Sequence, residues 1–250
     1  MKITFLGTAD VRPRKDANCS AAMLEINDAI YLCDAGAPIS ELLLQYGKDP
    51  ERVKGIFITH GHSDHFEGII PFLSRCFYVY PKADFTVVFP NNRQAQMLKT
   101  CCSSLHGGKA FPDGRIRFKV PTENESSVAY DDGLLKATYI PVSPYEGTPH
   151  FAVLFEAEGK SFLFTGDLSE GLKDGDFPTV AFERPLDLIV CEYAHVIEEH
   201  LAPCIERCKA KQICFNHYAG WRREELSAFV SNPRYKIPLR AVRDGDVIEA

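Results

Sequence analysis

Short apolar runs alternate with amphipathic segments along the whole chain. Runs such as Ile3–Leu6, Ala22–Ile26 and Ile30–Cys33 have the length and composition of buried strands. Between such runs, Ile39–Tyr46 and Asn91–Ser104 place apolar residues at helical spacing. This alternation predicts an α/β protein in which helices cover mixed β-sheets.

The second half of the chain continues the pattern with a higher share of strands. Leu186–Glu192 is the most apolar of them, and Glu158-Gly159-Lys160 is typical of a hairpin turn. The polar stretch Pro121–Asp132 is predicted to be one loop, and without a break in composition we expect a single domain over residues 1–250. Further strands are expected at Gly55–Thr59, Phe85–Phe89, Arg115–Val120, Leu134–Val142, Phe151–Glu156, Ser161–Thr165 and Gln212–Asn216, and further helices after His65, at Glu199–Lys209 and at Arg222–Val230.

Composition narrows the class of protein. Of the 250 residues, 45% are hydrophobic and 25% are charged, as in ordinary soluble proteins. The net charge of −6 argues against a long nucleic acid as partner, because proteins that bind one usually carry a basic face. The nine cysteines are odd in number and form no C-x-x-C pair, which predicts reduced thiols. With neither a signal peptide nor a membrane-spanning run, we expect a cytoplasmic protein without membrane contact.

The candidate chemistry lies directly after the predicted strand Gly55–Thr59. The segment His60-x-His62-x-Asp64-His65 brings three imidazoles and a carboxylate together within six residues. Imidazole and carboxylate groups suit zinc, manganese or iron. In an extended turn, the first two histidines point the same way, while the last two residues of the motif reach a neighbouring position. One segment can therefore supply ligands to two adjacent ions.

This motif resembles the signature of the metallo-β-lactamase superfamily. The resemblance covers nearly the whole chain and implies a four-layer αββα sandwich with two divalent metal ions at its edge. Zinc is the first expectation, and manganese and iron are the alternatives. By the same resemblance, His60, His62, Asp64 and His65 bind metal, Asp34 orients metal-bound imidazoles, Asp167 in Thr165-Gly166-Asp167 bridges the two ions, and His217 at the end of a strand is a further ligand.

One part of the chain departs from the pattern of the superfamily. The superfamily places a further histidine early in the loop after the strand Leu134–Val142, where this chain has none. His150, late in that loop, is the preferred replacement, and Glu146 is the alternative oxygen ligand. If neither binds metal, one ion is weakly held, and a non-catalytic metal-binding module becomes the competing interpretation.

Other segments resemble the ribonuclease Z and cyclic phosphodiesterase branch of the superfamily, namely the beginning of the chain from Ile3 to Ala9, Leu188–Glu192, and Ile213–His217. This resemblance implies that Glu192 orients a histidine that protonates the leaving oxygen. His200 matches that position, and His195 is its rival. The carboxylates of Asp64 and Asp167 are expected to orient the ligands and the nucleophile.

These features predict a metal-dependent hydrolase that cleaves a small anionic phosphodiester, cyclic esters included, by attack of a metal-bound hydroxide. The chain lacks the basic, glycine-rich insertion with which ribonuclease Z enzymes hold transfer RNA. The enzymatic alternative is hydrolysis of a thiolester or lactone on the same scaffold. Arg222 and Arg223 are either phosphate contacts or a solvated helix start. A homodimer is left open, because Trp221, Leu226 and Phe229 suit a core as well as an interface.

Overall fold

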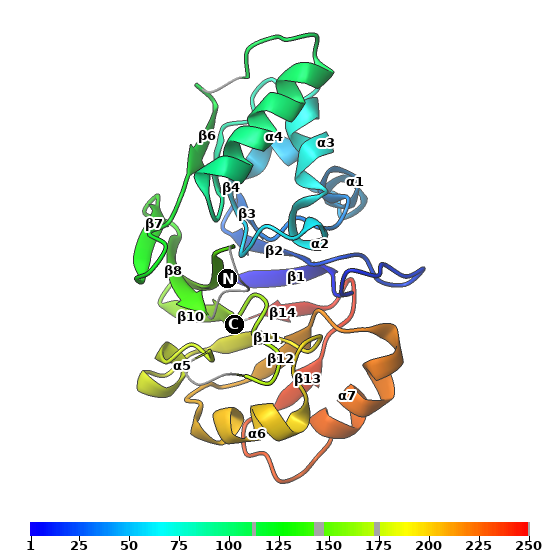
Figure 1. Ribbon diagram of the computed structural model, residues 1–250, viewed down its shortest axis with the longest axis vertical. Coiled ribbons are helices and arrows are strands. Elements are labelled where there is room, and N and C mark those ends of the chain that lie inside the picture. Colours follow the sequence, from blue (N-terminus) through cyan, green and yellow to red (C-terminus); the bar gives the residue numbers. More distant parts are fainter. Residues whose placement is uncertain (112–113, 143–147, 173–175, 250) are drawn as a thin grey trace.

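The computed structural model describes residues 1–111, 114–142, 148–172 and 176–249. Two seven-stranded β-sheets pack against each other, and helices cover the outer face of each sheet (Figure 1). The predicted four-layer αββα sandwich is therefore confirmed.

The first sheet has the strand order β14-β1-β2-β3-β4-β5-β6. From β3 to β6 the neighbouring strands are parallel, so their carboxyl ends meet at one edge. Helices connect these parallel strands, as such crossovers require. The strands of this sheet are β1 (Lys2–Gly7), β2 (Ala21–Ile26), β3 (Ala29–Cys33), β4 (Val53–Phe57), β5 (Phe85–Val88), β6 (Ile116–Lys119) and β14 (Val247–Glu249).

The second sheet has the order β13-β12-β11-β10-β9-β8-β7. Strands β10 to β13 are parallel, whereas β7 to β10 form an antiparallel meander. The predicted hairpin turn between β9 and β10 is present, with Glu158 and Gly159 at positive φ, as a tight two-residue turn requires. The strands are β7 (Ser127–Asp131), β8 (Lys136–Val142), β9 (His150–Ala157), β10 (Lys160–Phe164), β11 (Leu188–Glu192), β12 (Ile213–Asn216) and β13 (Leu239–Ala241).

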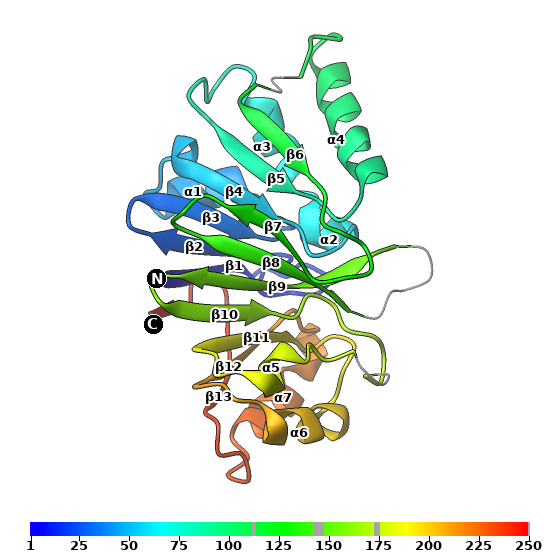
Figure 2. The same ribbon diagram turned by 90° about the vertical axis from the view of Figure 1, so that its left-hand side faces the viewer.

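The helices form the two outer layers. Figure 2 shows α3 and α4 outside the first sheet, and α5, α6 and α7 outside the second. Asn91 caps α4 by accepting the backbone N–H of Gln94, which fixes where this helix begins. The helices are α1 (Ile39–Gln45), α2 (Ser63–Phe66), α3 (Ile69–Arg75), α4 (Asn92–Leu105), α5 (Val180–Glu183), α6 (Glu198–Arg207) and α7 (Arg223–Val230), with 3₁₀ turns η1 (Pro50–Arg52) and η2 (Gly220–Arg222). None of the described helices has the length and apolar character that a membrane crossing requires.

Three buried apolar clusters hold the four layers together. One packs the first sheet against its helices, and another packs the second sheet against α5, α6 and α7. The third fills the space between the sheets, where the rings of Phe57 and Phe155 meet edge to face at 5.1 Å. Burial of this kind stabilises by roughly 25 cal/mol per Å² of apolar surface. The strands are thus fixed against one another, and so are the residues at their ends.

The structure corrects one sequence expectation and adds short strands. Part of the stretch predicted as a single loop forms the edge strand β7. Its Tyr130 is buried, and the phenol donates to the backbone oxygen of Lys54 and to Asp132, which ties the two sheets together. The strands β13 and β14 have three residues each, too few for a periodic pattern to show.

Candidate metal site and active site

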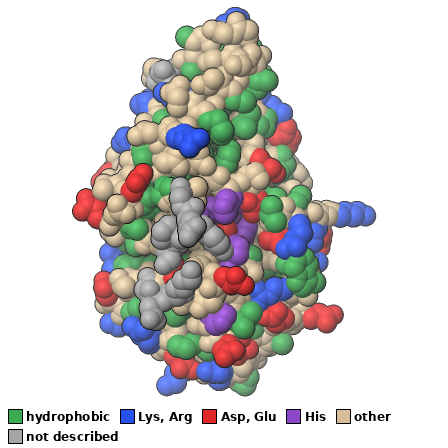
Figure 3. Space-filling view, in the orientation of Figure 1, with side chains coloured by type: hydrophobic (Ala, Val, Ile, Leu, Met, Phe, Trp, Pro, Cys, Tyr) green, Lys and Arg blue, Asp and Glu red, His purple; other side chains and the backbone are tan. Residues whose placement is uncertain are grey.

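The predicted site residues meet at one edge of the sandwich. The motif of residues 60–65 follows β4, Asp167 follows β10, Glu192 ends β11, His217 follows β12, and His150 begins β9. Figure 3 shows histidine side chains gathered on this face of the molecule. Because the carboxyl ends of β4, β10, β11 and β12 reach the same edge, residues far apart in sequence become neighbours.

His60, His62 and His150 form a first group. Their candidate ligand atoms lie within 4.8 Å of one another, and Nε2 of His60 is 3.0 Å from Nδ1 of His62. The rings of His60 and His150 stack at 4.2 Å. The structure thus brings His150 next to His60 and His62, as a replacement ligand requires. Glu146, the alternative, lies outside the described residues.

Asp64, His65 and His217 form a second group, and Asp167 lies between the two groups. Its carboxylate is 3.4 Å from Nε2 of His60, 3.2 Å from Nε2 of His65 and 3.4 Å from Nε2 of His217. Such a central carboxylate can bridge two cations, as the sequence predicts.

The chemistry of this donor set fits divalent cations. Nε2 of His65 and Oδ1 of Asp167 are fully buried, face each other at 3.2 Å, and have no hydrogen-bond partner of adequate geometry among the described residues. Burial and the neighbouring His65 hold the pKa of His60 well below its usual range, and burial lowers the pKa of His150 to about 4. A lowered pKa favours the neutral imidazole, which is the form that binds metal.

Buried polar groups around the histidines fix their orientation. Oδ2 of Asp34 lies 2.7 Å from Nδ1 of His65, while Oδ1 accepts the backbone N–H of Thr59. Ser20 Oγ lies 2.7 Å from Nδ1 of His217. Metal-binding imidazoles usually have such a partner on the second ring nitrogen. Asp34 was expected in this role, whereas Ser20 was missed, since nothing in the sequence marks a serine of the β1–β2 loop as a neighbour of His217.

The backbone at the site is unusual at several positions. Asp34 and His217 have φ of 57° and 48°, a region that side chains other than glycine seldom adopt. Gly36 has no room for a side chain, because a Cβ there would lie 1.7 Å from the backbone oxygen of Asp64. The turn after β3 thus packs directly against the start of α2, which carries the second half of the motif.

Glu192 is paired with His195 in the structure. Its carboxylate lies 3.1 Å from Nδ1 of His195 and accepts the backbone N–H groups of Leu168, Ala194 and His195. His195 also lies 3.8 Å from Asp167 and is grouped with that residue and His217. Burial lowers the pKa of His195, but the bond to Glu192 and the charges of Glu192 and Asp167 raise it to about 9.

The expected pairing of Glu192 with His200 therefore needs correction. Among the described residues, the histidine against Glu192 is His195, the rival candidate. His200 lies in the first turn of α6, with its ring edge beside Gly171. The sequence could not separate the two, because both follow β11 within a few residues.

Arg222 is not a phosphate contact in the structure. Its side chain is buried, and Nη1 donates to the carbonyl oxygens of Tyr193 (2.7 Å), Ala194 (3.3 Å) and Val196 (2.7 Å). The remaining nitrogens bind Glu225. Arg222 thus holds the loop that carries His195. Arg223 instead forms an ion pair with Asp16 at 2.7 Å.

Two hollows adjoin the histidine cluster. One, of about 440 Å³, is bordered by the candidate ligands His62, Asp64, Asp167 and His217 and by His195. The other, of about 880 Å³, lies next to His150 and is bordered by polar residues at the start of α4, among them Asn91, Asn92 and Gln94. A substrate bound between the two groups of ligands would have room on both sides.

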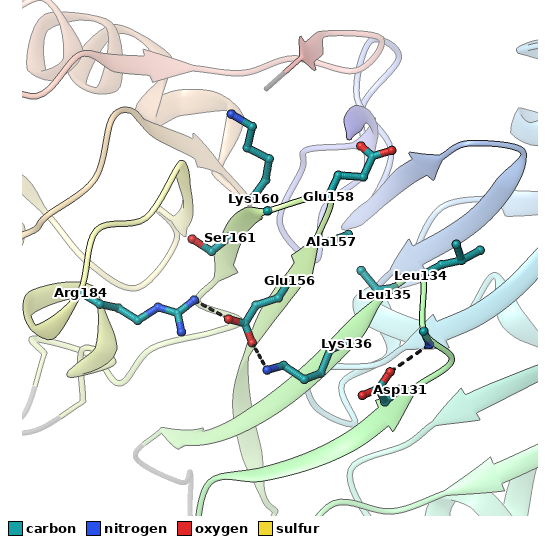
Figure 4. Close-up of a pocket in the computed structure, with 12 residues that line it drawn as sticks. Asp131, Leu134, Leu135, Lys136, Glu156, Ala157, Glu158, Lys160, Ser161 and Arg184 are labelled. Atoms are coloured by element: carbon teal, nitrogen blue, oxygen red, sulfur yellow. Dashed lines mark hydrogen bonds and ion pairs between the residues drawn. The ribbon is translucent and has the colours of Figure 1, made fainter.

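A further hollow, of about 430 Å³, lies at the opposite ends of β9 and β10 (Figure 4). Three of its charged side chains are paired with each other, since Glu156 binds both Lys136 and Arg184 at 2.6 Å. It contains no histidine, and no metal-binding group of the described residues lies there. The strand ends on the other side therefore remain the candidate site.

Comparison with solved structures agrees with this architecture. The chain is similar to the short form of human tRNase Z, with a TM-score of 0.74 and 20% identity over 100% of this chain and 99% of that one. It is equally similar to the metallo-β-lactamase fold protein YhfI from Bacillus subtilis, with a TM-score of 0.75 and 15% identity over 99% of both chains. These similarities show that the chain has the metallo-β-lactamase fold.

A family model described as anti-Pycsar protein Apyc1 matches residues 1–189, and the chain belongs to this family. Among curated relatives, ribonuclease Z of Methanothermobacter thermautotrophicus is 41% identical over 69 residues, which are 28% of this chain and 22% of that protein. Ribonuclease Z of Lacticaseibacillus casei is 28% identical over 142 residues, which are 56% of this chain and 42% of that protein. The chain thus spans less than half the length of these relatives.

Proposed function

We propose that the chain is a metal-dependent phosphodiesterase for a small phosphodiester, cyclic esters included. The observation that carries the proposal is the position of Asp167, between two groups of metal-binding side chains and 3.8 Å from a histidine that a carboxylate holds. Cleavage of a phosphodiester needs charge stabilisation at the phosphoryl oxygens and a proton for the leaving oxygen. The site offers groups for both tasks.

Two divalent cations would be held by the residues already described. His60, His62 and His150 suit the first cation, Asp64, His65 and His217 suit the second, and Asp167 reaches both. Bound divalent cations supply Lewis acidity toward phosphoryl oxygens and toward water. Asp34 and Ser20 keep the imidazoles of His65 and His217 turned toward the ions.

His195 is the residue that we assign to the leaving oxygen. Its ring borders the smaller hollow beside Asp64 and Asp167, so a phosphodiester bound at the ions would place one ester oxygen near it. Glu192 fixes the ring through Nδ1, and Arg222 fixes the backbone on both sides of it. A proton donor held in this way contributes on the order of 10²- to 10⁴-fold to the rate.

Charge favours a small substrate over a long RNA. A protein that grips an RNA neutralises several phosphates with lysine and arginine. Here the net charge is −6, and Arg12, the arginine that borders the smaller hollow, is paired with Asp10. The ribonuclease Z relatives make precursor transfer RNA the natural alternative substrate to test.

The deciding experiment is a substrate panel with the zinc- or manganese-loaded protein. The panel comprises bis(p-nitrophenyl) phosphate, a cyclic 3′,5′-nucleoside monophosphate, a precursor transfer RNA, a thiolester and a lactone. We expect cleavage of the two small phosphodiesters, with loss of activity in H62A. Cleavage of only the transfer RNA, or only of the thiolester or lactone, would reject the proposal, and so would full activity of H62A.

A further inference from the structure

We infer that Trp221 and Arg12 form a platform beside the candidate metal ligands, and that this platform binds an aromatic ring on the ester arm of the substrate. The ester arm is the organic group that is joined to phosphorus through an ester oxygen. This inference rests on the proposed function and names the class of ester that the site prefers. It concerns the hollow of about 440 Å³ next to the second group of ligands.

Trp221 is the only tryptophan of the chain, and 67% of it is exposed. It lies in η2, four residues after His217, and Leu226 and Phe229 on the following helix are buried in the core. Helix α7 therefore packs against the core through its apolar side chains, and the indole of Trp221 lies outside the core. Isolated exposed apolar residues are common in proteins, so the exposure gains meaning only from where the ring lies.

The indole shares one hollow with the candidate metal ligands. Asp64, Asp167 and His217 border this hollow on one side. Asp10, Val11 and Arg12 of the β1–β2 loop, together with Ala219 and Trp221 at η2, also border it. A phosphoryl group at the ligands would thus hold its ester arm within reach of the indole.

Arg12 is fixed against the ring. Its guanidinium carbon lies 3.9 Å from the centroid of Trp221. Asp10, which is buried, accepts Nε of Arg12 at 3.1 Å, Nη2 at 2.7 Å and the backbone N–H at 3.1 Å. A guanidinium held by a buried carboxylate keeps its plane without further ordering, and Nη1 donates to no residue within the described part of the chain. The indole and the guanidinium thus form a preorganised stacked pair.

The chemistry of this surface selects an aromatic arm. Indole rings stack with other aromatic rings, and arginine stacks on aromatic faces through its planar, weakly hydrated cation. Stacking of this kind is tolerant of the ring's identity, so aryl groups and nucleobases both qualify. An alkyl arm offers no π face and therefore gains less binding free energy from this surface. The preferred class is thus a phosphodiester with an aromatic ring or nucleobase close to the phosphorus.

Binding without turnover tests the platform directly. Phenylphosphonate and methylphosphonate carry the same anionic group and differ only in the ring. In calorimetric titrations of the zinc-loaded full chain, we expect phenylphosphonate to bind about tenfold more tightly, equivalent to about 1.4 kcal/mol. W221A should reduce this preference to less than about twofold, whereas W221F and R12K should retain part of it. Methylphosphonate affinity should change little in all three variants.

A matched control removes another exposed aromatic residue that lies under a cation. Tyr78 is 59% exposed and has Lys109 at 4.9 Å over its ring, and it follows the C-terminal end of α3 and does not border the hollow of Trp221. Y78A should keep the full preference. An unchanged preference in W221A would overturn the platform, as would a preference lost equally in Y78A. Dissociation of a dimer by W221A, with the preference retained, would assign the ring to an interface between copies and also overturn it.

The same titrations separate the two proposals. If the wild type binds phenylphosphonate selectively and W221A does not, but no phosphodiester is cleaved, the platform stands and the proposed function fails. If phosphodiesters are cleaved and both phosphonates bind equally, the proposed function stands and the platform fails.

Discussion

Nδ1 of His195 lies 3.1 Å from the carboxylate of Glu192, and the same carboxylate accepts the backbone N–H of His195. One acidic side chain thus fixes both the ring and the backbone of this histidine. Glu192 also accepts the N–H of Leu168, the residue after Asp167. The position of His195 is therefore linked to the central carboxylate of the metal site, which no local stretch of sequence reveals.

H195A should impair the cleavage of esters according to their leaving group. An alkoxide leaving group needs a proton, so kcat for an alkyl arm should fall on the order of a hundredfold or more. The p-nitrophenolate group leaves without one, and its kcat should fall much less. Steady-state kinetics on both kinds of ester measure the contrast. H200A is the matched control, and the same contrast in that variant in place of H195A would return the role to His200.

R222K should loosen the loop that carries His195. Lysine keeps the charge but cannot reach the carbonyl oxygens of Tyr193 and Val196 and the carboxylate of Glu225 at once. We expect the free energy of unfolding to fall by about 2 kcal/mol, because several hydrogen bonds to a charged group are lost. The kcat for alkyl esters should fall, with p-nitrophenyl esters little affected.

Arg223 supplies the control for this substitution. It pairs with Asp16, whose side chain is 60% exposed, and such pairs contribute little to stability. R223K should therefore change the free energy of unfolding by less than about 0.5 kcal/mol. Urea denaturation compares the two variants. Equal effects of R222K and R223K on stability and on the leaving-group contrast would contradict a positioning role for Arg222.

Metal content distinguishes His150 from Glu146. His150 stacks on His60 and lies within 4.8 Å of the ligand atoms of His60 and His62, so its removal should empty the first position. We expect elemental analysis to give about two metal ions per wild-type chain and about one in H150A, with E146Q unchanged. The reverse result would assign the ligand to Glu146, and one ion in the wild type would favour an incomplete site.

The sequence predicted the layers and the ligands better than the contacts around them. The motif of residues 60–65 could be predicted from the residues themselves, whereas Asp167 and His217 were assigned through the resemblance to the superfamily. All of them follow strands whose carboxyl ends meet at a common edge. His150 could be ranked above Glu146 but not located. Their binding of metal stays a prediction.

Long-range contacts explain what the sequence could not show. Ser20 reaches His217 across 197 positions of sequence, and Arg222 reaches Tyr193 across 29. A pair of arginines after a strand is typical of a solvated helix start or an anion contact. The burial of Arg222 under the loop that carries His195 instead results from tertiary packing. The edge strand β7 was missed for a similar reason, since only the burial of Tyr130 against the other sheet distinguishes it from a polar loop.

G36A should disturb the site through the backbone. A Cβ at Gly36 would lie 1.7 Å from the carbonyl oxygen of Asp64, and a backbone atom cannot move aside as a flexible side chain can. We expect the free energy of unfolding to fall by about 3 kcal/mol, as for severe overpacking, with weaker metal binding at the Asp64 position. Urea denaturation and metal titration measure both effects. G114A is the control, because a Cβ there meets no atom within 4 Å, and equal losses in both variants would exclude the close approach as the cause.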